Sequence, residues 1–130
     1  MRVLFNLFCR DIEAQVRFYG ALLGLPELSQ LRSPIYRALA AGETELGFNG
    51  EAAYELLALA ERRPAAEAAA PVTAYATFML DACADVDAAA HRAVALGGGV
   101  VKAPYRTYYG HWQAVLHDPE HQIFRVSAEA

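Results

Sequence analysis

The sequence has no cluster of lysine or arginine, no long apolar run and only two cysteines. Its 11 basic and 15 acidic residues give a net charge of −4, which argues against a nucleic-acid partner. Because no apolar run approaches about 18 residues, neither a membrane span nor a membrane partner is expected. No secretory signal pattern is visible at the N-terminus, and two cysteines are too few for a disulfide framework. These absences predict a reduced, cytoplasmic protein.

What the chain does contain is enough apolar sequence for one domain. It has 130 residues, of which 55% are hydrophobic and 20% charged, a composition typical of a globular core. Residues 3–24 form the unit around which the rest is organised: a strand, an aspartate turn and an amphipathic helix. Asp11 is predicted to cap this helix and Gly24 to end it.

The same unit occurs a second time, 74 positions further along the chain. Residues 9–14 match residues 83–88, and Gly98 matches Gly24. Asp85 is therefore predicted to cap the second helix. A repeat that occurs only twice, at this spacing, favours two copies of a half-domain over a solenoid.

Each half is predicted to contain a strand, a helix and three further strands. The predicted strands are residues 2–9, 27–31, 35–40 and 44–48 in the first half, and 73–80, 100–103, 111–117 and 122–127 in the second. The predicted fold class is α+β: two tandem βαβββ modules form a curved, eight-stranded, antiparallel-type sheet around a cavity, with helices outside. Within the single domain 1–130, the modules are residues 1–50 and 73–128. A helical connector, residues 51–72, joins them.

The helical runs 11–24 and 85–98, the segment 45–48 and the ending 109–122 occur in a characteristic order. With these spacings the chain resembles the vicinal oxygen chelate superfamily: glyoxalase I, bleomycin-resistance proteins and extradiol dioxygenases. In metal-using members, the resemblance implies a histidine on the first strand and a glutamate on the last strand of each half. These four ligand positions fall on Leu4, Glu45, Phe78 and Arg125.

Three of those four residues cannot bind a metal ion, because leucine, phenylalanine and arginine offer no lone pair to it. A single carboxylate does not hold a transition metal against water, so neither a metal site nor a cofactor is expected. His111, His117 and His121 do not replace the missing ligands. The first two lie six positions apart on one predicted strand, roughly 20 Å, and cannot share an ion.

Strand alternation predicts that Leu4, Asn6, Glu45, Phe78 and Arg125 face one apolar-walled cavity. Glu45 and Arg125 are expected to form an ion pair, within one chain or across a dimer, because a buried unpaired carboxylate is costly. The pair either satisfies itself or contacts the ligand.

Aromatic residues cluster near the predicted mouth of the cavity. Trp112 and Tyr108, with Tyr105 and Tyr109, would offer a flat ligand a large contact area. Packing against the other half or subunit is the alternative for this group. Tyr36 and Tyr54 are weaker candidates of the same kind.

Two functions follow from this site. The first is a metal-free protein of the glyoxalase/bleomycin-resistance type that sequesters a hydrophobic or aromatic small molecule. The second is a glyoxalase-like lyase or isomerase, or a dioxygenase-related enzyme, with an atypical site in which Glu45 is the base. A structural dimer regulated by a partner is a third alternative. The resemblance also implies a homodimer.

Overall fold

The computed structural model describes residues 1–65 and 71–130, and the chain divides into two compact units, residues 1–68 and 69–130. Both units combine a helix with a mixed sheet, so the predicted α+β class is confirmed. The described residues form seven strands in two sheets, of three and four strands, where a single eight-stranded sheet was predicted. No helix in the described part of the chain is long and apolar enough to cross a membrane.

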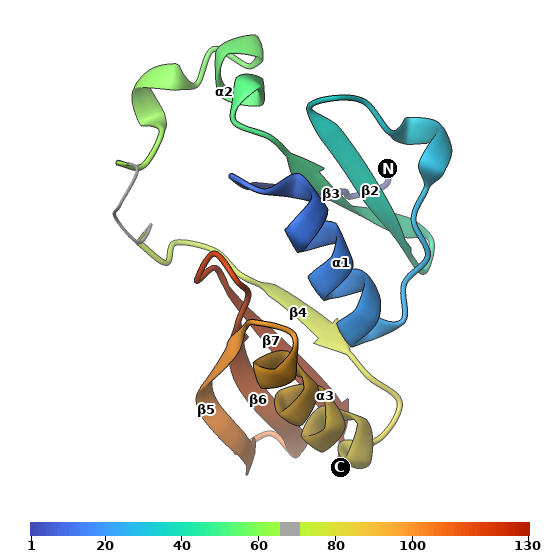
Figure 1. The fold of residues 1–130 in the computed structure, drawn as a ribbon. Coiled ribbons are helices and arrows are strands. Elements are labelled where there is room, and N and C mark those ends of the chain that lie inside the picture. Colours follow the sequence, from blue (N-terminus) through green and yellow to red (C-terminus); the bar gives the residue numbers. More distant parts are fainter. Residues whose placement is uncertain (66–70) are drawn as a thin grey trace. The chain divides into compact units, whose positions relative to one another are not determined.

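Unit 1 places one long helix on a three-stranded sheet (Figure 1). Its elements are β1 (Phe5–Phe8), α1 (Ile12–Leu23), a 3-10 helix (Ser29–Leu31), β2 (Tyr36–Ala41), β3 (Thr44–Asn49), α2 (Ala52–Leu56) and a second 3-10 helix (Ala60–Arg62). The strand order is β1-β3-β2; β1 runs parallel to β3, and β2 antiparallel to it. The central strand β3 therefore carries the hydrogen bonds of both neighbours.

The sequence predicts both ends of α1 correctly. The Asp11 carboxylate accepts a hydrogen bond from the backbone N–H of Ala14 at 3.0 Å, which satisfies a donor that a helix start leaves free. Gly24 ends the helix with φ 66°, a left-handed conformation that glycine adopts without a Cβ penalty. Local sequence thus determines both ends of α1, and packing against the sheet determines its orientation.

The predicted connector helix over residues 51–62 is two short helices instead. Between them, Ala58 adopts a left-handed backbone with φ 58°, which a continuous helix does not allow. Residues 66–70 of the predicted connector lie outside the described residues.

The predicted strand over residues 27–31 is wrong. Only Glu27 bridges to a strand, at Leu39, and the chain then turns into a 3-10 helix. The Glu27 carboxylate accepts hydrogen bonds from Arg32, at 2.9 Å to its Nε, and from Arg37, at 3.2 Å to its Nε. These two guanidinium groups lower the pKa of Glu27 to about 2 and fix the segment through side chains rather than through a strand ladder.

Replacing Glu27 with glutamine is expected to lower the free energy of unfolding by about 1–2 kcal/mol at neutral pH, because both arginines lose their carboxylate. The folded pKa lies below the ordinary value of 4.5, so the ionised form stabilises the fold above that pH. The difference between wild type and Glu27→Gln should shrink as the pH falls from about 4.5 towards 2. Denaturation curves across this range test it. Glu43→Gln, an exposed turn position, is the matched control, and a difference that does not change with pH would contradict the assignment.

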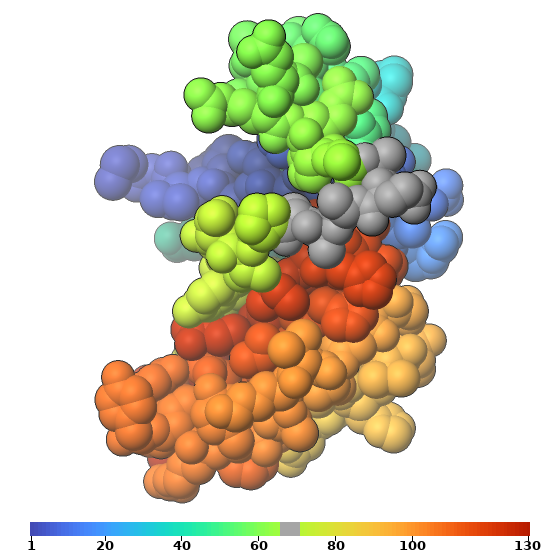
Figure 2. Space-filling view, turned by 90° about the vertical axis from the view of Figure 1, so that its left-hand side faces the viewer, coloured from blue at the N-terminus to red at the C-terminus, as the bar shows by residue number. Residues whose placement is uncertain are grey.

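Unit 2 places one helix on a four-stranded sheet. Its elements are β4 (Ala76–Met79), α3 (Cys83–Ala95), β5 (Gly99–Arg106), β6 (His111–His117) and β7 (Ile123–Glu129). The order is β4-β7-β6-β5, in which β4 runs parallel to β7 and the other pairs are antiparallel. Strands β4 and β5 are the two edge strands, and β5 is drawn in orange on the surface of this unit in Figure 2.

The second helix begins earlier than predicted. Its N-cap is Ala82, and Asp85 lies in the first turn, where its carboxylate accepts a hydrogen bond from the Ala82 N–H at 3.1 Å. The strands before the two helices correspond at a spacing of 71, since β1 begins at Phe5 and β4 at Ala76. The spacing of 74 therefore describes the match between residues 9–14 and 83–88 in sequence, but not the positions of the two strands.

Candidate functional site

Each sheet has one face that its own helix covers and one that it does not; the second is called the open face. In unit 1, Leu39, Leu46 and Phe48 lie on the covered face and are at most 2% exposed. The cross-strand pairs Asn6–Gly47 and Ala40–Glu45 place Asn6 and Glu45 together on the open face, as the alternation predicts. Leu4 precedes the first strand and is 40% exposed.

Asn6 and Tyr36 converge over the backbone of Gly47. A Cβ at position 47 would collide with Asn6 Oδ1 and with the Tyr36 hydroxyl, and would lie 2.9 Å from Tyr36 Cε1. Glycine is therefore required here for a close approach of side chains, not for backbone conformation. The Asn6 amide and the Tyr36 hydroxyl are therefore close together over the central strand of the open face of unit 1.

Glu45 lies at the same face with its side chain 16% exposed. Its Oε1 lies 3.4 Å from Nη2 of Arg2. Burial, and secondly the negative charge of Glu45, raise the pKa of the Tyr36 phenol, so this hydroxyl stays a hydrogen-bond donor at neutral pH. Glu45 and Arg125 belong to different units, and the ion pair between them stays a prediction.

Tyr54 packs against the end of β1. Its ring stacks on Phe8 at 3.9 Å between centroids, and the side chain is almost fully buried. This contact attaches α2 to the sheet, so Tyr54 has a structural role in unit 1.

Arg125 lies on the open face of unit 2, on β7. Its Nε donates to Thr77 Oγ1 at 3.0 Å, and its guanidinium carbon lies 4.8 Å from the centre of the Tyr75 ring. The hydrogen bond and the ring together fix the plane of the guanidinium group. Sequence reasoning placed Arg125 on a ligand-facing strand but missed Tyr75 and Thr77.

A hydrogen-bonded row continues the open face towards β5. Gln113, which is buried, donates to the Tyr105 hydroxyl at 2.7 Å and accepts from the Tyr109 hydroxyl at 3.0 Å. Next to it, Nδ1 of His111 lies 3.1 Å from Oγ of Ser127. These hydrogen bonds fix the positions of the tyrosine and histidine rings on the sheet. No sequence pattern predicts them.

Phe78 and Trp112 lie on the other face of this sheet, and the prediction that Phe78 shares a face with Arg125 is wrong. Phe78 is partly buried and pairs with Val126, and its ring centre lies 5.9 Å from that of the buried Phe124, on the face that α3 covers. Trp112 has the same orientation, and its Nε1 donates to Oδ1 of Asp87 on α3 at 2.7 Å. The physical reason is the spacing of 71 between the strands: it makes Tyr75 the counterpart of Leu4, and Phe78 the counterpart of Leu7.

The signal that could have found Tyr75 and Thr77 is the alternation within β4 itself. Ala76 and Phe78 are the partly buried residues of the strand, and Thr77 and Met79 the exposed ones. A threonine flanked by apolar residues marks the opposite face more reliably than a match between helix sequences.

Tyr108 lies in the turn between β5 and β6. It is fully exposed, and its ring contacts Tyr109 edge to face at 5.0 Å. Among the described residues, no three His, Cys, Asp or Glu side chains lie close enough together to hold a metal ion.

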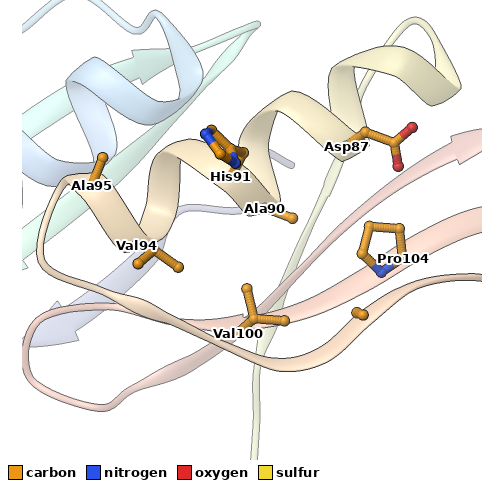
Figure 3. A pocket seen from close by; sticks show the side chains of 8 residues that line it. Asp87, Ala90, His91, Val94, Ala95, Val100 and Pro104 are labelled. Atoms are coloured by element: carbon orange, nitrogen blue, oxygen red, sulfur yellow. The ribbon is translucent and has the colours of Figure 1, made fainter.

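A separate shallow pocket lies between α3 and β5 (Figure 3). It has a volume of about 480 Å³ and is lined mainly by apolar side chains, with Asp87 and His91 as its polar members. None of the predicted site residues lines it. His91 projects from α3 and is one of the side chains that line this pocket.

A family model described as the Glyoxalase/Bleomycin resistance protein/Dioxygenase superfamily matches residues 3–126. The chain belongs to this superfamily. No curated protein matches it. A crystal structure of a glyoxalase/bleomycin resistance protein/dioxygenase family enzyme from Burkholderia phytofirmans PsJN is 38% identical, with a TM-score of 0.89 over 98% of this chain and 97% of that one.

Two further glyoxalase-type structures share the fold at lower identity. A glyoxalase-related enzyme from Fulvimarina pelagi is 21% identical, with a TM-score of 0.77 over 99% of this chain and 88% of that one. A lactoylglutathione lyase from Agrobacterium tumefaciens is 21% identical, with a TM-score of 0.68 over 98% and 92%. The superfamily thus fixes the fold, whereas the function has to be argued from the side chains of this chain.

Proposed function

We propose that this superfamily member is a metal-free small-molecule binding protein, which holds a hydrophobic or aromatic ligand against the open faces of its sheets without turnover. The observation that carries the proposal is the placement of Arg125. A guanidinium group, fixed by Thr77 and Tyr75, stands where metal-using relatives are expected to have a carboxylate.

The donor set at the four family positions does not fit a metal ion. Leu4 and Arg125 have no lone pair to offer, and the carboxylate of Glu45 already lies beside Arg2. With Tyr75 in place of Phe78 as the counterpart of Leu4, the fourth position carries a phenol whose ring contacts a cation. One carboxylate and one phenol are too few donors to hold a divalent ion against water.

The side chains that remain suit a flat apolar ligand. Tyr75, Tyr105 and Tyr109 line the open face of unit 2, and Asn6 and Tyr36 supply polar groups in unit 1. Rigid rings give contact area at little entropic cost, and a few placed polar groups set orientation. Leu4, Glu45, Arg125 and Tyr108 stay in the proposed ligand site, whereas Phe78 and Trp112 would act through the core beneath them.

The protein as purified is expected to contain far less than one metal ion per chain, and a chelator should leave its melting temperature unchanged. A neutral flat probe, N-phenyl-1-naphthylamine, should raise the melting temperature by several degrees at saturating concentration, because a ligand of the native state stabilises it by mass action. Elemental analysis and a thermal-shift titration measure both. Stoichiometric metal whose removal lowers the melting temperature would overturn the proposal.

A second function is a lyase or isomerase that uses Glu45 as general base. It is favoured by the Tyr36 phenol, whose raised pKa keeps it protonated close to the Glu45 carboxylate. Incubation with the hemithioacetal of methylglyoxal and glutathione separates the two functions. Thioester formation that Glu45→Gln abolishes and Glu43→Gln leaves intact would establish the enzyme; the binding function predicts none.

The homodimer and the cytoplasmic location are part of the same proposal. Light scattering of the purified protein tests the first. A monomer at micromolar concentration would count against a ligand site shared between subunits.

A further inference from the structure

We propose that the ligand carries one anionic group, a carboxylate or a sulfonate, which Arg125 binds on the open face of unit 2. The inference rests on the proposed function, since it names the chemical class of the molecule bound at that site. It starts from the charge of Arg125 and from what surrounds it.

Arg125 is partly buried and has no carboxylate partner among residues 71–130. Within that part of the chain its contacts are the hydrogen bond from Nε to Thr77 and the face of the Tyr75 ring. Nε is therefore occupied, and the two terminal nitrogens form the edge that is left for a ligand. That edge matches the two oxygens of a carboxylate or sulfonate.

Charge on this sheet favours an anion. Glu129 is the only acidic residue in the four described strands of unit 2, and it lies four positions beyond Arg125, roughly 13 Å along the strand. Lys102 and Arg125 both pair with Val115, so the two cations flank it in one row across the sheet. The Lys102 ammonium group lies 3.7 Å from the centre of the Tyr105 ring. A partly desolvated cation without a counter-charge among residues 71–130 costs free energy that a bound anion would offset.

The surroundings of Arg125 suit the apolar body of such a ligand. Alternation places Val115, Ile123 and Met79 on the same face as Arg125. An anion held by Arg125 would therefore extend over aliphatic and aromatic side chains. The predicted ligand is a flat, apolar molecule with a single acidic group, not a polyphosphate or a sugar.

A pair of fluorescent dyes that differ only in the anionic group tests this. The probes are 8-anilinonaphthalene-1-sulfonate and its neutral parent, N-phenyl-1-naphthylamine, each titrated into the intact protein. Arg125→Gln is expected to weaken binding of the sulfonate by about 10-fold or more, and to change binding of the neutral dye by less than about 2-fold. Arg125→Lys keeps the positive charge but not the two parallel N–H donors of the guanidinium group, so its affinity for the sulfonate should lie between those of wild type and Arg125→Gln. Arg106→Gln is the control, because Arg106 pairs with Trp112 on the opposite face.

The outcomes separate the two proposals. Equal loss of the sulfonate in Arg125→Gln and Arg106→Gln, or no loss in either, would overturn the anionic ligand while the binding function stands. Failure of the neutral dye to bind wild type would count against the binding function instead. Circular dichroism of each variant shows that it is folded, and Arg125→Lys provides the readout if Arg125→Gln is not.

Discussion

Replacing Phe48 with alanine is expected to lower the free energy of unfolding by about 3–5 kcal/mol. Phe48 is fully buried on the central strand β3, and its ring packs 5.5 Å from that of Tyr19 on α1. Truncation leaves a cavity between helix and sheet that close-packed neighbours fill only in part. The open face of unit 1 depends on the same strand, because Glu45 and Gly47 lie on it.

Urea denaturation followed by circular dichroism measures this loss. Leu56→Ala is the control: Leu56 is equally apolar but 73% exposed on α2, so its truncation should change stability by less than about 0.5 kcal/mol. A Phe48→Ala protein within about 1 kcal/mol of wild type would mean that α1 does not rest on this ring.

Local signals made the first helix predictable. Asp11 and Gly24 are chemical signals that act within one turn, and the structure uses both of them. The central strand β3 was equally predictable, because a glycine on either side, Gly42 and Gly50, marks the limits of residues 44–48. The predicted strand over residues 27–31 is wrong because this segment is held by hydrogen bonds from two arginines, five and ten positions after Glu27, to the Glu27 carboxylate. Side-chain networks of that kind leave no periodic pattern to read.

In the second half of the chain, a match between helix sequences predicts the wrong register for the strand that precedes the helix. Residues 83–88 match residues 9–14 in letters, yet the helix starts at Cys83 instead of after Asp85. The error of three positions is odd, and an odd shift moves every side chain of a strand to the other face. The match therefore predicts Phe78 on the face of Arg125, where the structure has Tyr75 and Thr77 instead.

Those exchanged residues change the chemistry of the candidate site. With Phe78, the surroundings of Arg125 would be purely apolar, and a carboxylate partner would be needed to balance its charge. With Thr77 and Tyr75, the guanidinium group is held by a hydroxyl and a ring, neither of which neutralises it. The sequence predicted a cation at the site, but only the strand register shows that a hydroxyl and an aromatic ring are its neighbours within unit 2.

The second large effect is expected from Asp118→Ala, which should lower the free energy of unfolding by about 2–4 kcal/mol. Asp118 is fully buried in the turn between β6 and β7. Its Oδ1 accepts hydrogen bonds from the backbone N–H groups of Glu120, at 2.8 Å, and Gln122, at 3.0 Å. Alanine would leave both donors without this acceptor, in a turn where His121 already holds a left-handed backbone with φ 65°.

Asp118→Asn separates the shape of the turn from its charge. An amide oxygen can still accept from the same N–H groups but without the added strength of a carboxylate, so we expect about half the loss. Asp81→Ala, at an exposed position after β4, is the matched control and should change stability by less than about 0.5 kcal/mol. Urea denaturation measures all three variants.

Because β7 begins directly after this turn, an Asp118→Ala protein that remains folded should also bind 8-anilinonaphthalene-1-sulfonate less tightly through displacement of Arg125. Unchanged stability would show that the β6–β7 pairing, not the aspartate, positions that strand.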